Sequence, residues 1–210
     1  PDQDEAENED YPLVTHVDAD RTDPESIHAA SSDASKTVEP ELSDAADAPK
    51  EVARRALDHA RDGARVLVIR NLVDDCIKTQ QELESLAGDN TLLFGVDGTP
   101  APHHSRFATD DRQRLDDAVE ATFGPDTPNR GVVAVATQTV EQSLDLDADL
   151  MITDLCPMDV LLQRIGRLHR HSRVRPDGYE TARCVVLTPE ERDLAPHISD
   201  DGQAFGPHGL

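Results

Sequence analysis

The segment Arg65-Val66-Leu67-Val68-Ile69-Arg70 decides the fold class of this chain. Its four central residues are all apolar, and a short uninterrupted apolar run is typical of a strand that is covered on both faces. The dipeptide Asp62-Gly63 stands just before it and ends the preceding segment of helical periodicity. The run therefore predicts an interior strand of a parallel sheet.

Helical and strand patterns alternate along the chain around this run. We expect helices over residues 51–62, 73–86, 109–122 and 160–169, and strands over residues 65–70, 91–94, 132–136, 150–153 and 183–187. This alternation predicts an α/β domain with a parallel sheet and flanking helices. Ligands of such sheets lie beyond the carboxyl ends of the strands, so the loops that follow the strands are the candidate site. These loops begin after Ile69, Phe94, Ala136 and Thr153.

The beginning of the chain differs in composition from the rest. Residues 1–50 carry 15 acidic and 3 basic side chains, in a chain of 210 residues with a net charge of -23. Such a segment cannot bury enough apolar surface to offset its chain entropy. We therefore expect residues 1–48 to be a disordered linker or surface insertion, with one short strand around residues 13–17. The alternative is an acidic arm that mimics nucleic acid or closes a basic groove.

Other features of the composition limit the class of protein. The three cysteines, Cys76, Cys156 and Cys184, show no C-x-x-C spacing, which argues against a disulfide framework or a zinc site and fits a reducing cytosol. The sequence shows no signal peptide and no apolar run long enough to span a membrane. We expect residues 49–190 to form one domain and residues 191–210 to begin a truncated C-terminal extension.

Three arginines recur at helical spacing in Gln163-Arg164-Ile165-Gly166-Arg167-Leu168-His169-Arg170. Residues at i, i+3 and i+6 of a helix share a face. A group of guanidinium ions on so acidic a chain needs an anionic target, and phosphate matches its geometry best. The segment therefore indicates nucleoside-triphosphate hydrolysis, and a solvated helix face is the alternative reading.

Two further segments join this arginine segment in a family resemblance. The strand over residues 132–136 is followed by the polar loop of residues 137–147, and His103-His104-Ser105-Arg106-Phe107 precedes the helix expected from residue 109. Together, over residues 51–210, these resemble the second RecA-like domain of superfamily 2 helicases. Residues 137–147 resemble helicase motif V, and residues 163–170 resemble motif VI.

The resemblance is narrower than superfamily 2 as a whole. The H-S-R-F tetrapeptide, followed by Asp111-Arg112-Gln113-Arg114, resembles the CRISPR-associated helicase-nuclease of type I systems, as do residues 200–209. Two alternatives stay open. One is the equivalent domain of another superfamily 2 helicase, against which the H-S-R-F stretch argues. The other is a non-catalytic acidic interaction module on a degenerate helicase fold, against which the intact arginine segment argues.

The resemblance implies a role for each matching residue. Arg167 and Arg170 match the arginine fingers that reach the phosphates of ATP bound to a partner domain, where they neutralise developing charge. Gln163 and Arg164 match positions that contact the nucleotide or couple it to the opposing domain, and Asp145 matches the motif V acid near the ribose and the fingers. Asp145 could equally be a turn former. Matches to positions along the nucleic-acid backbone are Ser105, Arg106, Arg112, Thr137 and Gln142.

Several motifs of a complete motor are absent from the sequence. It has no G-x-x-x-x-G-K-[ST] loop, no D-E-A-D or D-E-x-H tetrapeptide and no His-Asp dipeptide. The resemblance then implies that ATP and Mg²⁺ are bound mainly by a first RecA-like domain missing from this chain, as is the nuclease domain. We expect the isolated chain to be inactive and to hold no metal. The implied partners are single-stranded DNA, the missing domains and a CRISPR surveillance complex, in a prokaryotic cytoplasm.

Overall fold

The computed structural model describes residues 13–16, 25–28 and 36–190, apart from residues 126, 129, 142 and 143. The chain divides into two units, residues 1–36 and residues 37–210. In the first unit, β1 (Leu13–His16) pairs antiparallel with β2 (Glu25–His28), which confirms a strand around residues 13–17. The linker role of residues 1–36 and the C-terminal extension of residues 191–210 stay predictions.

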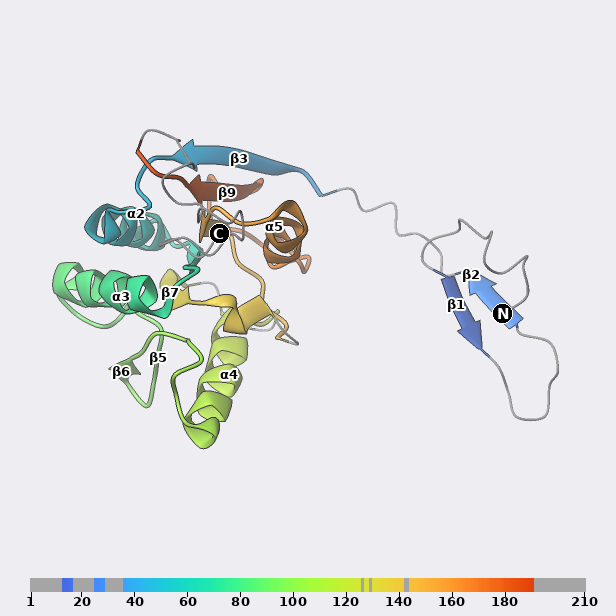
Figure 1. Ribbon diagram of the computed structural model, residues 1–210, viewed down its shortest axis with the longest axis horizontal. Helices are drawn as coiled ribbons and strands as arrows, with labels where there is room; N and C mark the ends of the chain where they lie inside the picture. Colours follow the sequence, from blue (N-terminus) through green and yellow to red (C-terminus); the bar gives the residue numbers. More distant parts are fainter. Residues whose placement is uncertain are drawn as a thin grey trace, which may run out of the picture. The chain divides into compact units, whose positions relative to one another are not determined.

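The second unit is built on a five-stranded sheet in which all the strands are parallel. Its order is β3-β9-β8-β4-β7, and Figure 1 shows β3 and β9 side by side at one edge. The α/β class with a parallel sheet is confirmed. The strands are β3 (Val38–Ser43), β4 (Arg65–Ile69), β7 (Val132–Ala136), β8 (Leu150–Asp154) and β9 (Ala182–Leu187).

Strand β3 corrects the expected boundary of the acidic linker. Residues 38–48 were predicted to be disordered, but β3 pairs with β9 along its whole length, from Val38 opposite Ala182 to Ser43 opposite Leu187. Four of its six residues are exposed. An edge strand tolerates charged residues and proline that an interior strand would not. Its acidic sequence therefore looked like linker, although it forms part of the sheet.

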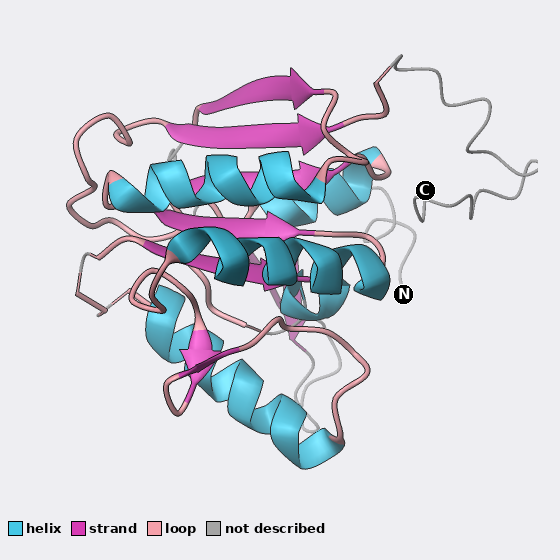
Figure 2. Ribbon diagram, turned by 90° about the vertical axis from the view of Figure 1, so that its left-hand side faces the viewer, coloured by secondary structure: helices cyan, strands magenta, loops and turns pink. Residues whose placement is uncertain are grey.

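Two apolar cores lie on opposite faces of the sheet. Val66 and Val68 of β4 pack in the core beneath α2 (Pro49–Arg61) and α3 (Val73–Ala87). Leu67 and Ile69 pack in the other core. Successive side chains of a strand point to opposite faces, so an uninterrupted apolar run is what a strand with both faces covered requires. Figure 2 shows α2 and α3 lying together across one face of the strands.

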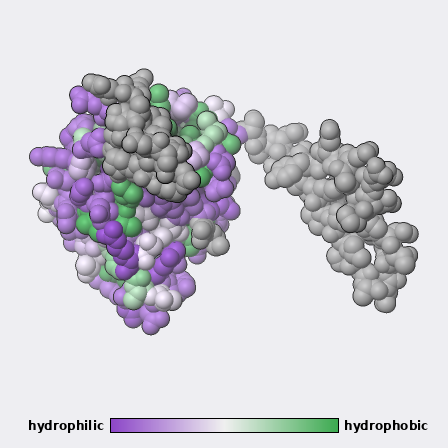
Figure 3. Space-filling model, viewed as in Figure 1, coloured by the Kyte–Doolittle hydropathy of each residue, from purple (hydrophilic) through white to green (hydrophobic). Residues whose placement is uncertain are grey.

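The second core involves α4 (Thr109–Phe123) and the residues that follow α5 (Met158–Ile165). Leu115, Val119 and Phe123 of α4 are buried there, together with Leu168. The surface seen in Figure 3 is mostly hydrophilic. Among the described residues, no helix combines the length and apolar character needed to cross a membrane.

The prediction of a strand over residues 91–94 is wrong, because only one of these residues pairs with the sheet. Leu93 forms only an isolated parallel bridge with Val133 of β7. The chain then enters a small hairpin of β5 (Gly95–Val96) and β6 (Thr99–Pro100), whose turn residue Asp97 has a φ of 51°. This tight turn takes the chain away from the sheet edge before a ladder can form.

The helix expected over residues 160–169 is also corrected, because α5 ends at Ile165. Gly166 is its C-terminal cap, and Leu168 forms a parallel bridge with Ala148. His169 has a φ of 43°, in the left-handed region. The residues beyond Ile165 are thus held by backbone bonds to the segment before β8, and the three arginines do not share one helical face.

Candidate functional site

The candidate site lies where the expected loops meet, at the carboxyl ends of β4, β7 and β8. The 3-10 helix η1 (Gln138–Glu141) follows β7 directly. Gln138 donates from Nε2 to the carbonyl oxygen of Asn71, in the loop after β4, at 3.0 Å. The loops after neighbouring strands are therefore bonded to one another, as their place in a parallel sheet predicts.

Arg164 is a buried hub of this region, with 1% of its side chain exposed. Its Nε donates to Oε1 of Glu141 at 2.8 Å, which links α5 to η1. Its two terminal nitrogens donate to Oγ1 of Thr153 at 2.7 Å and to Oδ1 of Asn71 at 3.0 Å. Arg164 thus connects the loop after β4, the helix η1 after β7 and the end of β8, and its guanidinium points into the chain.

A second buried arginine fixes the loop after β4. Arg70 donates from Nε to both carboxylate oxygens of Asp154, at 3.0 Å each. It also donates to the carbonyl oxygen of Ala46 at 2.7 Å, and the backbone N–H of Asn71 donates to Asp154 at 2.7 Å. The interior tolerates this ion pair because the surrounding bonds satisfy both charges.

Arg167 lies just beyond α5 and is 9% exposed. One terminal nitrogen donates to the carbonyl oxygen of Glu141 at 2.6 Å, and the other donates to that of Leu144. Glu141 therefore receives hydrogen bonds from two arginines, through its carboxylate from Arg164 and through its carbonyl from Arg167. Two of the five N–H donors of Arg167 are used in these bonds.

Arg170 is the most exposed of the three arginines, with 43% of its side chain accessible. Its Nε lies 2.8 Å from Oδ1 of Asp145, and Nε2 of His171 approaches the same oxygen at 2.8 Å. The structure thus brings together two predicted nucleotide residues, one from each motif-like segment. The backbone N–H of Arg170 donates to Oδ1 of Asp147 at 2.9 Å, which orients the turn.

A buried charge cluster beside Arg170 was not foreseen from the sequence. Asp147 and Asp149 are fully buried, and Arg173 and Arg175 each bond to both of them. The four distances lie between 2.7 and 3.0 Å. Burial acts to raise the pKa of Asp147, but hydrogen bonds from Arg175 and Arg173 outweigh it and hold this pKa below its usual value. The sequence signal was the pairing of Asp-x-Asp with Arg-x-Arg.

The predicted nucleic-acid residues lie along the β7 edge and at the start of α4. Thr137 is buried and donates its backbone N–H to the carbonyl oxygen of His103 at 2.9 Å, so the segment before Ser105 runs beside the end of β7. Ser105 and Arg106 are exposed, and Arg106 pairs with Asp74 at 2.6 Å. The remaining members are Arg112, which is partly exposed on α4, and Gln142, which lies outside the described residues.

Gln163 is exposed on α5, one residue before the buried Arg164.

The described residues do not gather the ligands of a metal site. Among residues 36–190 with their gaps, no group of three or more His, Cys, Asp or Glu side chains is placed to hold an ion. The adjacent His103 and His104 are both buried, and His104 stacks on Phe107 with ring centroids 4.5 Å apart.

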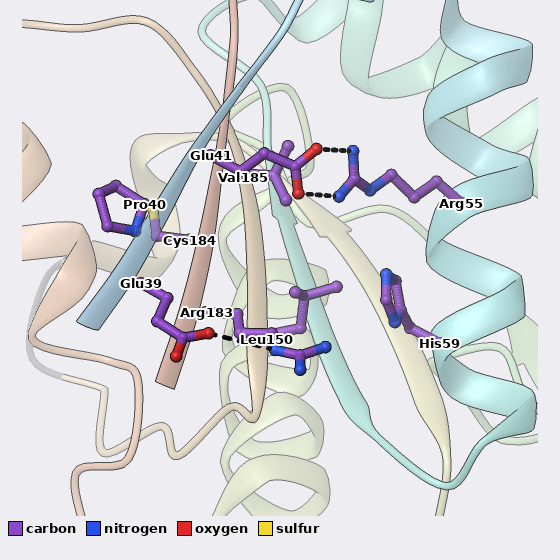
Figure 4. A pocket seen from close by; sticks show the side chains of 9 residues that line it. All are labelled: Glu39, Pro40, Glu41, Arg55, His59, Leu150, Arg183, Cys184 and Val185. Carbon is purple, nitrogen blue, oxygen red and sulfur yellow. Dashed lines mark hydrogen bonds and ion pairs between the residues drawn. The ribbon is translucent and has the colours of Figure 1, made fainter. Parts of the chain in front are cut away.

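A hollow of about 250 Å³ opens between β3, β9 and α2, as Figure 4 shows. Its charged side chains bond to one another, with Arg55 donating to the two carboxylate oxygens of Glu41 at 2.8 and 2.5 Å. Arg183 lies 3.8 Å from Glu39. None of the predicted site residues that the structure describes lines this hollow, so it is separate from the candidate site.

Comparisons with known proteins identify the family of this chain. The family model described as CRISPR-associated nuclease/helicase Cas3, C-terminal, matches residues 62–173, which is more than half of the chain. The CRISPR-associated endonuclease/helicase Cas3 of Escherichia coli is 40% identical over 156 residues. That match covers 73% of this chain and 16% of the relative. The CRISPR-associated endonuclease/helicase Cas3 of Thermus thermophilus is 44% identical over 107 residues, covering 50% of this chain and 11% of that protein.

Solved structures show the same relationship. The crystal structure of T. fusca Cas3-AMPPNP superposes with a TM-score of 0.63 at 30% identity, over 85% of this chain and 22% of that one. A chain of a CRISPR RNA-guided surveillance complex, pre-nicking, gives a TM-score of 0.60 at 31% identity, over 74% of this chain and 19% of that one. The Mycobacterium smegmatis helicase Lhr, at 19% identity and a TM-score of 0.51, shares the fold.

The present chain thus spans about a sixth of the length of its E. coli relative. The family match over residues 62–173 is to the C-terminal part of Cas3, and the parallel sheet with flanking helices fits a RecA-like domain. The chain belongs to the CRISPR-associated nuclease/helicase Cas3 family, as its C-terminal, RecA-like helicase domain.

Proposed function

We propose that this chain is the C-terminal half of an ATP-dependent DNA motor in CRISPR antiviral defence. It supplies arginine fingers to ATP held by a nucleotide-binding domain outside this chain, and it contacts the backbone of single-stranded DNA. In this proposal Mg²⁺ is held mainly by that other domain, and the motor works in the prokaryotic cytoplasm with a surveillance complex as partner. The named relatives support it, because one was solved as Cas3-AMPPNP and another in a surveillance complex.

The observation that carries the nucleotide part is the exposed ion pair between Arg170 and Asp145. The guanidinium is presented at the surface of an ordered turn, and a single carboxylate holds it at 2.8 Å. Phosphate oxygens are a stronger and geometrically matched acceptor for such a group. Arg170 can therefore exchange Asp145 for the phosphates of ATP when the partner domain closes.

The other residues of the nucleotide group take different parts in this proposal. Arg167 keeps donors for phosphate while its bonds to the carbonyls of Glu141 and Leu144 fix its direction. Arg164 serves as the coupling residue, since its donors already bond to Glu141, Thr153 and Asn71. The exposed Gln163 lies at the same end of the segment and is accessible to the opposing domain.

ATP supplies the chemistry of the motor, a phosphoanhydride whose hydrolysis develops negative charge on the transferred group. Arg170 and Arg167 neutralise that charge in the transition state. The DNA part rests on the nearness of Thr137 to the segment that carries Ser105 and Arg106. The exposed hydroxyl of Ser105 and guanidinium of Arg106 donate to phosphate oxygens and so position the strand without reading its sequence.

The test is the replacement Arg170→Ala in the full-length protein. Loss of a finger lowers ATPase kcat by about 10³-fold or more, whereas the KM for ATP changes little, because the interaction strengthens in the transition state. Arg61→Ala is the matched control, since Arg61 on α2 is similarly exposed and also bonds to one carboxylate, that of Asp58. A normal kcat for Arg170→Ala would leave Arg170 as an ordinary surface charge.

A further inference from the structure

His103 is a fully buried histidine that the proposed function does not use. Its backbone extends the sheet beyond β7, because its N–H donates to the carbonyl oxygen of Val135 at 2.8 Å. Its own carbonyl oxygen accepts the N–H of Thr137 at 2.9 Å. The residue therefore lies directly against the turn of residues 137–139, where the nucleic-acid contacts are proposed.

Both ring nitrogens of His103 have partners. Nε2 lies 2.7 Å from Oδ1 of Asp116, which reaches in from α4 and is itself partly exposed. Nδ1 lies 2.7 Å from Oγ1 of Thr139, in η1. One imidazole thus connects a helix on one side to the turn after β7 on the other.

The chemistry of the partners fixes the direction of these bonds. The carboxylate of Asp116 can only accept, so Nε2–H donates to it. Burial lowers the pKa of His103, with Arg112 acting in the same direction and Asp116 opposing, so the ring is neutral near pH 7. Nδ1 of a neutral ring then accepts, and the hydroxyl of Thr139 donates to it.

Thr139 is consequently held from several sides. Its hydroxyl also donates to the carbonyl oxygen of His103 at 3.1 Å, and its Oγ1 lies 3.4 Å from Oγ1 of Thr137. The single hydrogen of this hydroxyl is shared between two acceptors of His103, Nδ1 and the carbonyl oxygen, so the Thr139 oxygen keeps a fixed place beside the Thr137 hydroxyl. The shape of the turn of residues 137–139 is therefore set by the side chain of His103.

Simple packing does not account for this arrangement. A leucine fills a comparable volume without burying two polar nitrogens, and burying a polar group costs free energy unless it is hydrogen-bonded. Here both nitrogens are bonded, one of them to the turn of residues 137–139. These side-chain bonds help to specify the geometry of that turn. With an apolar side chain in place of His103, only backbone hydrogen bonds would hold it.

We propose that His103, anchored by Asp116, is a positioning residue that holds the turn of residues 137–139 in the shape that contacts nucleic-acid phosphate. The proposal rests on the proposed function of this surface. It assigns to His103 and Asp116 an effect on DNA affinity, transmitted through Thr139 and Thr137, and no effect on the hydrolysis of ATP.

The test uses the full-length protein with His103→Leu and Asp116→Leu, singly and together. Binding of a fluorescent single-stranded oligonucleotide is measured by anisotropy, and ATPase is titrated with the same DNA. Each single variant raises the DNA midpoint about tenfold, the effect of losing one or two hydrogen bonds, while kcat at saturating DNA stays within about twofold. The DNA midpoint of the double variant is no higher than that of His103→Leu, because the two residues act through one chain of hydrogen bonds.

His59→Leu is the matched control. His59 is a half-buried histidine of α2 whose Nδ1 bonds to the hydroxyl of Tyr179 at 2.6 Å, on the other face of the sheet. The His59→Leu variant should leave the DNA midpoint unchanged. The DNA midpoint of Asp116→Asn should be close to that of wild type, because an amide oxygen still accepts from Nε2–H of His103.

Two results would overturn the inference. One is a wild-type DNA midpoint in a folded His103→Leu protein or, if that variant does not fold, in Asp116→Leu. The other is a DNA midpoint that rises as much in His59→Leu as in His103→Leu, which would mean a general loss of stability. Absence of any DNA binding in the wild-type protein would instead refute the proposed function, so the two failures are distinguishable.

Discussion

Glu141 and Arg164 form a buried ion pair of 2.8 Å that joins η1 to α5. The two side chains are 9% and 1% exposed, so the pair is not screened by solvent. Because Glu141 also binds Arg167 through its carbonyl oxygen, the pair fixes the place of a proposed finger relative to the turn that carries Thr137. The turn proposed to contact nucleic acid and the arginines proposed to contact nucleotide thus share one buried connection.

Breaking this pair from one side should be strongly destabilising. Arg164→Met leaves the carboxylate of Glu141 buried without its partner, a change that costs about 3–5 kcal/mol. Glu141→Gln should cost less, since the amide oxygen still accepts from Nε. Urea unfolding measures both, with Arg54→Ala as an exposed-pair control expected within about 1 kcal/mol of wild type. Equal stability of Arg164→Met and wild type would show that the hub contributes little.

The DNA surface should respond to Arg106→Ala in the full-length protein. Arg106 and its partner Asp74 are both exposed, and exposed ion pairs contribute little to stability, so the fold should survive the change. The variant should weaken DNA-stimulated ATPase equally for all sequences, lower the slope of log affinity against log salt by about 1, and spare the basal rate. Unchanged DNA affinity together with collapsed basal turnover would assign Arg106 to the nucleotide site or to the fold.

The isolated chain should show no ATPase activity above background, with or without DNA. Its sequence contains no phosphate-binding loop and no acidic tetrapeptide for Mg²⁺, so fingers alone have no nucleotide to act on. A phosphate-release assay at high protein concentration measures this. Arg170→Ala distinguishes contaminating activity from genuine activity, since turnover that depends on Arg170 would contradict the division of the motor into two halves.

The interior strands of the fold were predictable because a strand that is buried on both faces requires an uninterrupted run of apolar residues. The runs over β4, β7 and β8 are apolar at every central position but one, Thr153 near the end of β8, and the structure confirms each strand. Strand β3 was missed since an edge strand carries Glu39, Pro40 and Glu41 with little cost.

The candidate site was predictable only in part. The family resemblance implied that Asp145 lies near Arg170, and the structure joins them. The sequence could not show that α5 ends at Ile165, because the end of the helix depends on a bridge between Leu168 and Ala148. Nor could spacing show that Arg164 points inward, or that His103 meets Thr139, 36 residues away along the chain. Such contacts depend on how distant segments pack.

The charge cluster beside Arg170 should make the stability of the fold sensitive to acid. Burial opposes the ionisation of Asp147, but the hydrogen bonds from Arg175 and Arg173 outweigh it and hold the pKa below its usual value. A carboxylate whose pKa is lowered on folding contributes stability above its unfolded pKa of about 3.9, and loses it as pH falls through the folded pKa. Between about pH 7 and 5 this contribution should be constant, and below about pH 4 it should fall.

Asp147→Asn tests this directly, because it keeps the shape of the side chain and removes its titration. At pH 7 the variant should be less stable by about 3–5 kcal/mol, since two buried guanidinium groups lose part of their compensating charge. Its loss of stability on going from about pH 5 to pH 3 should be smaller than that of wild type, because one lowered pKa no longer contributes. Urea unfolding across this pH range measures both effects, with Asp58→Asn on the exposed face of α2 as control. An acid dependence identical to wild type would show that Asp147 is not ionised in the folded protein, and the cluster would then hold Arg170 by hydrogen bonds without a net ion pair.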